Sequence, residues 1–266
     1  INTHYNGYDL AVKKSTLVRD FAEGEFSVKA KEEVYLPALG GQDVDDYNAY
    51  LERGYLVPAV EPTALAIIGA IMRIDPVFDP TGSINYLLED FDGEGNSATN
   101  FVEGMIKQLL YAGSAGYLIE YTDKAIVKEY TKESIINVSP DYIVLMQEYQ
   151  EQDKKDKFLQ YTKKEYLELT YDEYGNYIQN IWRQAKGKEF VIVETITPTN
   201  RGQSLTRIPF VFSNPLSSDP VLLHLSNINH KQYMQSTDES HGLHWTALPT
   251  GFLFGELTDS KGQKKQ

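Results

Sequence analysis

The stretch HLSNINHKQYMQSTDESHGLH, residues 224–244, contains four of the five histidines of this 266-residue chain, with Asp238 and Glu239 among them. Imidazole and carboxylate groups are common zinc ligands, and a catalytic zinc takes three such protein ligands around one ion. A metal-dependent hydrolase is therefore the first chemistry to test. The chain has no cysteine, which excludes thiolate ligands and disulfides.

The spacing of these residues on a helix argues against one shared ion. His230 and His241 would lie on the same face but about 16 Å apart along the axis. His224 and His230 are six residues apart and point in different directions. Asp238 and His244 diverge in the same way, and the HExxH pattern of zinc proteases is absent. The spacing favours a polar helix surface, and a hydrolase built on Asp238, His241 and His244 remains an alternative.

The helix that would carry these residues is expected within 216–250. Asp219 is a suitable N-cap, and Pro220 suits the first helical position. The helix could run from 220 to 247, about 40 Å at 1.5 Å per residue. Such a length is unusual for a globular domain, where the mean helix has about three turns.

One face of this expected helix combines small and polar side chains with a few leucines. It is too weakly apolar for a core and too regular for a free surface. We therefore expect this face to pack against a neighbouring copy of the chain. The candidate inter-subunit residues are Leu222, Leu225, Asn229, Ser236, Ser240 and Leu243.

The stretch DFDGEGNS, residues 90–97, resembles the start of a calcium-binding loop. With Asp90 at position one, the bidentate acid required at position twelve is replaced by Phe101. The sequence instead favours a turn that leads into a helix capped by Ser97 or Thr99. No metal or cofactor is expected here.

Helices are predicted up to about residue 113. Short helices are expected over 15–24 and 43–54, with an extended stretch over 34–39 between them. In EPTALAIIGAIMRIDP, residues 61–76, apolar residues occupy almost every face, which predicts a helix buried on most sides.

Antiparallel strands are expected from about 116 to 212, beginning with GYLIEY. From about 141 the hydrophobic pattern changes to period two, which is typical of half-buried strands. Polar turns separate DYIVLMQEY, KEYLELTY, NYIQNIWRQ and EFVIVETIT, which indicates an antiparallel meander, and IPFVF is expected as one more strand. The sequence as a whole predicts an α+β fold followed by one long helix.

Composition narrows the function further. The net charge is −13, so the chain has no overall attraction for phosphates and no tight, sequence-independent grip on DNA is expected, which leaves duplex DNA as passing cargo open. The longest apolar run, 64–72, is too short to cross a membrane. Phosphate-binding loops and nucleophile elbows are absent, so we expect no enzyme activity. The 19 tyrosines leave a β-rich adhesion module as another alternative.

Several segments together resemble a known family. In AYLERGYLVPAVEPTALAIIGAIMRIDPVF, residues 49–78, a YL-x-R-aromatic stretch precedes a helix of the pattern T-x-x-x-L-x-G-x-hydrophobic-x-R-x-x-P, with isoleucine at the leucine position. The matching residues are Tyr50, Leu51, Arg53, Tyr55, Thr63, Ile67, Gly69, Ile71, Arg73 and Pro76. The loop 90–97 and the stretches 109–121, 135–149, 208–215 and 222–255 follow in the same order. This ordered set resembles tailed-phage portal proteins, in particular a subgroup catalogued as a domain of unknown function, although that subgroup usually has a tryptophan after Ile-Ile-Asn.

The resemblance implies a portal wing over 1–215, a stem helix over 216–250 and the start of the clip region over 251–266. Portal proteins form a ring, usually of twelve subunits, around a DNA channel at the capsid vertex. The implied partners are other copies of the chain, terminase, capsid and head-tail adaptor proteins. The implied location is the virion, after assembly in the host cytoplasm. Portals continue beyond the clip, so the chain is expected to be a fragment or a truncated form.

Overall fold

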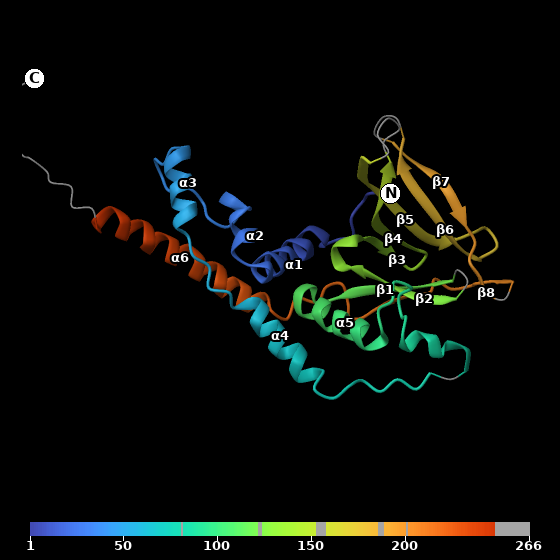
Figure 1. The fold of residues 1–266 in the computed structure, drawn as a ribbon. Helices are drawn as coiled ribbons and strands as arrows, with labels where there is room; N and C mark the ends of the chain where they lie inside the picture. Colours follow the sequence, from blue (N-terminus) through green and yellow to red (C-terminus); the bar gives the residue numbers. More distant parts are fainter. Residues whose placement is uncertain (81, 122–123, 153–157, 186–188, 201, 248–266) are drawn as a thin grey trace, which may run out of the picture.

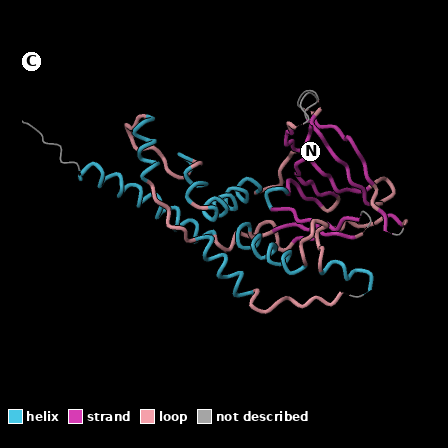
Figure 2. The backbone as a smooth tube through the Cα atoms, in the orientation of Figure 1, coloured by secondary structure: helices cyan, strands magenta, loops and turns pink. Residues whose placement is uncertain are grey.

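The computed structural model describes residues 1–80, 82–121, 124–152, 158–185, 189–200 and 202–247. The molecule is elongated, with its strands gathered at one end and most of its helices toward the other (Figures 1 and 2). The last helix runs away from the sheets. The fold is α+β, as predicted.

Most of the helices precede the strands in sequence. Two of them begin at a capping side chain: Asp43 accepts a hydrogen bond from the Asp46 backbone N–H, and Ser97, one of the two predicted caps, accepts one from the Asn100 backbone N–H. Ser97 is thus confirmed as a cap. The described helices are α1 Tyr8–Glu23, α2 Glu25–Lys29, α3 Val44–Arg53, α4 Val60–Ile71, α5 Ala98–Ala112 and α6 Leu223–Ala247, with short 3-10 helices η1 Glu32–Val34, η2 Gly82–Leu88 and η3 Lys132–Ser134.

The strands form two main antiparallel sheets. The smaller sheet has the order β10-β1-β2, and the larger is the meander β3-β4-β5-β6-β7, of which β4 to β7 were predicted; β3 and β2 were not. The strands are β1 Ala115–Tyr121, β2 Ala125–Thr131, β3 Ile135–Ser139, β4 Tyr142–Gln152, β5 Gln160–Tyr171, β6 Tyr177–Gln184, β7 Phe190–Ile196 and β10 Phe210–Phe212, with the short pair β8 Thr199–Asn200 and β9 Gln203–Ser204. The predicted alternation in β5 is confirmed, because Leu167 and Leu169 are both buried.

The hydrophobic residues form two principal cores. One lies where the sheets meet and includes Leu118 of β1 and Leu145 of β4. The other joins the helices and includes Val18 of α1, Val60 of α4 and Tyr233 of α6. The two ends of the molecule therefore have separate interiors, and the elements between them must hold the ends together.

The two edges of the meander differ. At one edge the Tyr5 backbone N–H donates to the carbonyl of Ile136 in β3, and Tyr5 packs against the small apolar cluster that contains Ile136. At the other edge, within the described part of the chain, β7 pairs with β6 alone. The N-terminal residues thus cover one edge and leave the other open.

Three sequence predictions need correction. The long helix begins at Leu223 rather than 220, because the Leu222 backbone N–H donates to Leu110 of α5 and fixes a turn before the helix. Asp219 is consequently outside the helix, and the helix continues through Gly242. Residues 34–39 contain the end of η1 and a loop, not a strand. The first predicted helix begins at Tyr8 instead of 15.

The predicted clip region, 251–266, lies outside the described residues. Among the helices that are described, none has the length and apolar character that a membrane span would need.

Candidate assembly interface

The N-terminal half of α6 is built into the body of its own chain. Leu222 and Asn229 are buried, and Leu225 packs against the helical core. These three residues were expected to face another copy. They lie instead against neighbouring helices of the same chain, because α1, α3 and α4 all contact α6.

The polar groups on this face bind the main chain of the segment between α3 and α4. The Asn229 side-chain amide donates to the Val57 carbonyl at 2.9 Å. The Ser236 hydroxyl donates to the Tyr55 carbonyl at 2.8 Å. Small and polar residues here do allow a close approach, but the approaching chain is residues 54–57. The argument that this half of the face was too polar for a core is therefore wrong.

The other two candidate residues are less enclosed. Ser240 is half-buried, and Leu243 is 60% exposed. Only the C-terminal part of the predicted face is therefore open to a second copy in the described chain. Whether a second copy packs there stays a prediction.

The histidine-rich part of α6 makes separate polar contacts. The Tyr50 hydroxyl of α3 donates to Asp238 at 2.5 Å, and burial together with this hydrogen bond raises the pKa of Tyr50. The same ring meets His241 edge-on, with centroids 5.1 Å apart. Arg53 donates to Nδ1 of His241 at 3.3 Å, so that nitrogen acts as an acceptor. Asp238 and His241 thus fasten α6 to α3.

The remaining histidines lie elsewhere. His230 donates through Nε2 to the Tyr35 carbonyl at 2.9 Å, His224 is exposed, and His4 contacts Asp9. Within the described residues, no three His, Cys, Asp or Glu side chains come together as a possible metal-binding group. The structure does not assemble the ligand set that the hydrolase alternative requires.

The loop that resembles a calcium site is held by its own hydrogen bonds. Asp92 accepts from the backbone N–H groups of Glu94 and Asn96, at 2.9 and 3.3 Å. Asp90 accepts from Gly95 and pairs with Lys124 at 2.6 Å. These donors lower the pKa of Asp90, led by Lys124. The carboxylates therefore serve the turn that leads into α5.

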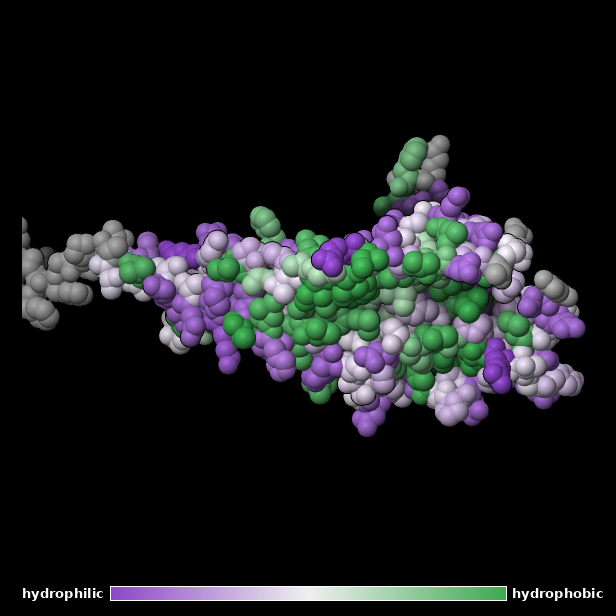
Figure 3. Space-filling view, turned by 90° about the horizontal axis from the view of Figure 1, so that it is seen from below, coloured by the Kyte–Doolittle hydropathy of each residue, from purple (hydrophilic) through white to green (hydrophobic). Residues whose placement is uncertain are grey.

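A feature that the sequence pattern did not indicate is the open face of α4. Its inner side, formed by Val60, Ala64 and Ile68, is buried. On its outer side Leu65 is 53% and Ile71 55% exposed. The prediction of a helix buried on most sides is therefore wrong for the described residues, among which α4 has neighbours on one side. Figure 3, viewed from the side of the molecule on which α4 lies, shows hydrophobic residues gathered over a broad region.

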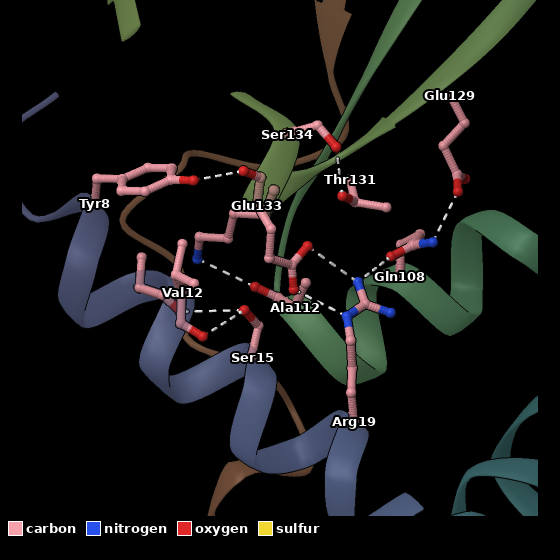
Figure 4. Close-up of polar contacts among 12 residues, drawn as sticks. Tyr8, Val12, Ser15, Arg19, Gln108, Ala112, Glu129, Thr131, Glu133 and Ser134 are labelled. Atoms are coloured by element: carbon pink, nitrogen blue, oxygen red, sulfur yellow. Dashed lines mark hydrogen bonds and ion pairs between the residues drawn. The ribbon is translucent and has the colours of Figure 1, made fainter. Parts of the chain in front are cut away.

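A polar junction connects the helical end with the sheets, formed by Arg19, Gln108, Glu129 and Glu133 (Figure 4). Arg19 of α1 donates through Nε to Glu133 at 2.9 Å, and through a terminal nitrogen to Gln108 of α5 at 2.7 Å. Gln108 in turn donates to Glu129 of β2 at 2.7 Å. The Tyr8 hydroxyl donates to the Glu133 carbonyl at 2.6 Å. This polar junction ties α1 and α5 to β2 and to η3, which precedes the meander.

Burial and charge act in opposite directions on the two carboxylates of the polar junction. Burial opposes ionisation of Glu133, but the hydrogen bonds and charge of Arg19 outweigh it and lower its pKa. Burial raises the pKa of Glu129, and the hydrogen bond from Gln108 only partly offsets it. Glu133 is therefore the ionised partner of Arg19, whereas burial disfavours the ionised form of Glu129.

Lys132, next to Glu133, is buried with 1% of its surface exposed. Its ammonium group donates to the carbonyls of Ala112 and Ser218, at 3.1 and 2.7 Å. Burial lowers its pKa. Lys132 therefore joins the C-terminal end of α5 to the turn that precedes α6. Nothing in the local sequence distinguishes it from a surface lysine, because its partners are main-chain carbonyls distant in sequence.

Comparison with known proteins does not assign the chain to a family. Neither a protein-family model nor a curated protein matches this chain.

Proposed function

We propose that the chain is the wing and first stem helix of a phage portal protein, a structural subunit of the ring-shaped DNA channel at the capsid vertex. The observation that best supports this is the placement of α6. It is fixed to the body by Asn229 and Ser236 and by Leu222 just before it, and its C-terminal end extends away from the sheets (Figure 1). A ring of such subunits could place these helices around a common axis.

The open face of α4 supports contact with a neighbouring subunit. A ring needs two different complementary surfaces on each copy, and an uncovered apolar helix is a suitable half of such a contact. Leu65 and Ile71 supply apolar area. A methyl group added at Gly69 would meet no atom within 4 Å, which leaves room for a close approach. In this proposal a neighbour covers α4 in the assembled ring.

The polar junction suits a protein that must resist mechanical force. It joins α1, α5 and the sheets through hydrogen bonds and one Arg–carboxylate pair, which connect the two ends of the molecule. A subunit that guides DNA needs such rigidity, because flexible wings would let the channel helices drift.

The role proposed for the protein is mechanical, in packaging and ejection of the genome. ATP hydrolysis would belong to a separate terminase, and capsid and head-tail adaptor proteins would be the other partners. The proposed location is the portal vertex of the virion. The net charge of −13 is compatible with DNA sliding past without being held.

Electron microscopy of the purified full chain, combined with sedimentation at several concentrations, tests this proposal. We expect rings, and we expect Leu65→Asp in α4 to abolish them, because it places a charge in each repeated contact. Leu10→Asp is the matched control, since Leu10 is a similarly exposed leucine on α1. Monomers at every concentration, or rings lost equally in both variants, would contradict the proposal.

A further inference from the structure

A cavity of about 450 Å³ lies between α5 and the outer edge of β2. Three consecutive residues of β2, Lys128, Glu129 and Tyr130, line it. Since neighbouring side chains of a strand point to opposite faces, a cavity that touches three residues in a row lies at the edge of the strand. The other walls are formed by α5, by the loop that contains residues 92–96 and by β4.

The main chain of β2 is unpaired where it meets this cavity. Ile119 of β1 lies opposite Val127 of β2, yet the Ile119 N–H donates to Pro209 and the Val127 N–H to Phe91, so the two residues point away from each other. In an antiparallel ladder such pairs recur at every second residue, and the main-chain N–H and C=O of Glu129 therefore also point outward. Phe91 occupies the edge at Val127, but nothing in the described part of the chain occupies it at Glu129.

The side chain of Glu129 has no charged partner of its own. Its carboxylate accepts a hydrogen bond from the neutral amide of Gln108, whereas Arg19 forms its ion pair with Glu133 (Figure 4). Burial raises the pKa of Glu129, as described above. A cation placed beside this carboxylate would favour its ionised form.

The lining of the cavity is acidic. Asp92 and Glu94 from the loop accompany Glu129, and the basic residue of the described lining, Lys128, is paired with Glu120 at 2.8 Å. Among the described residues these carboxylates do not come together as a metal-binding group. The charge of the cavity therefore suits a cation that is carried on an organic side chain.

An added strand would satisfy both the main chain and the side chain of Glu129. A residue directly opposite Glu129 would exchange two main-chain hydrogen bonds with it, and its side chain would lie on the same face as the Glu129 carboxylate. We propose that this cavity binds an extended peptide segment of a partner protein, with an arginine or lysine opposite Glu129.

The wall formed by α5 has room for such a peptide. Phe101, which is only 9% exposed, supplies an apolar surface for the aliphatic stem of a basic side chain. A methyl group added at Gly104 would meet no atom within 4 Å, so the helix leaves space there. The site uses neither α4 nor α6. It goes beyond the proposed function and does not depend on ring formation or on the passage of DNA.

The test is a fluorescence-anisotropy titration of a fluorescein-labelled peptide, Gly-Ser-Thr-Arg-Thr-Ser-Gly, with the full chain. We expect saturable binding, and none when glutamate replaces the arginine. Methylation of the main-chain nitrogen of the arginine should weaken binding about tenfold or more, because it removes the N–H that pairs with the C=O of Glu129. Failure of the arginine peptide to bind would overturn the site, and equal binding of the methylated peptide would overturn the strand pairing.

Two variants of the chain locate the binding. Glu129→Gln should weaken binding of the arginine peptide about tenfold or more, because it removes the charge inside the cavity. Glu103→Gln is the matched control, since Glu103 is an exposed glutamate of α5 outside the cavity lining, and it should leave binding nearly unchanged. Equal losses in the two variants, or no loss in Glu129→Gln, would refute the proposal. Thermal unfolding shows whether both variants fold, and the methylated peptide tests the pairing on the unmodified chain.

The outcome can be separated from the test of the proposed function. Rings seen without peptide binding would leave the portal proposal standing and remove the peptide site. Peptide binding by a chain that forms no rings would have the opposite meaning.

Discussion

At the scale of single residues, Gly113 lies where the end of α5 passes close to the main chain of the turn before α6. It ends α5 with a φ of 77°, and a methyl group at its Cα would lie 2.5 Å from the carbonyl oxygens of Ser218 and Asp219. Glycine is therefore required twice, once for its backbone conformation and once for space.

We expect Gly113→Ala to lower the free energy of unfolding by more than the roughly 1–3 kcal/mol of backbone strain alone. Gly175→Ala is the matched control, because Gly175 has a similar φ of 79° and no atom within 4 Å of the added methyl group. Urea unfolding of both variants measures the difference. Equal losses would mean that the turn before α6 moves freely away from Gly113.

Glu133 should make stability depend on acid pH. Its pKa is lowered in the folded protein from the ordinary value of 4.5. The stabilisation is therefore complete above about pH 4.5 and is lost as pH falls through the folded pKa. Glu133→Gln should lower the stability at neutral pH by about 1.5–3 kcal/mol, the range for hydrogen bonds to charged groups.

The variant should also have a shallower loss of stability between neutral and acid pH than the unmodified chain. Thermal unfolding of both proteins across that range is the measurement. Parallel curves would show that the pair with Arg19 contributes little. Glu129 affects the pH dependence of stability in the opposite direction. Its pKa is raised in the folded protein, so folding disfavours its ionised form.

At the scale of elements, α4 offers a test of assembly that does not damage the monomer. Replacing a helical glycine with alanine stabilises a helix by roughly 0.5–1 kcal/mol when space allows. Gly69 in α4 and Gly104 in α5 both have that space. We expect both alanine variants to unfold at higher temperature, and only Gly69→Ala to weaken assembly, because its methyl group would separate α4 from a neighbour.

Calorimetry gives the first result and sedimentation the second. If Gly104→Ala weakens assembly as much as Gly69→Ala, the neighbour does not pack closely on α4.

The elements differ in how far the sequence determines them. The alternation in the meander and the Ser97 cap are local patterns, and both were predicted correctly. The surroundings of α4 and α6 were not, because a hydrophobic pattern shows which face is buried but not what buries it. The partners of Asn229 and Ser236 are main-chain carbonyls, which no residue type reveals. The same is true of Lys132.

At the scale of the whole molecule, charge governs the relation to DNA. With 38 acidic and 25 basic residues, most of the surface should repel phosphates. We predict weak binding to free duplex, without sequence preference. It should decline steeply as salt rises, because the release of counterions from DNA then gains less entropy. Fluorescence anisotropy at low and physiological salt measures it. Tight binding that persists at physiological salt would indicate a dedicated DNA-binding role.

The helical core has a consequence for the order in which a nascent chain can fold. Val18 and Phe21 near the start of the chain share that core with Leu222 and Tyr233 near its end. The ribosome must therefore release α6 before α1 can bury its apolar side completely. The meander, complete by Ile196, depends mainly on strands adjacent in sequence and can form earlier. During synthesis the first helices should remain exposed to chaperones and proteases longest, although they emerge first.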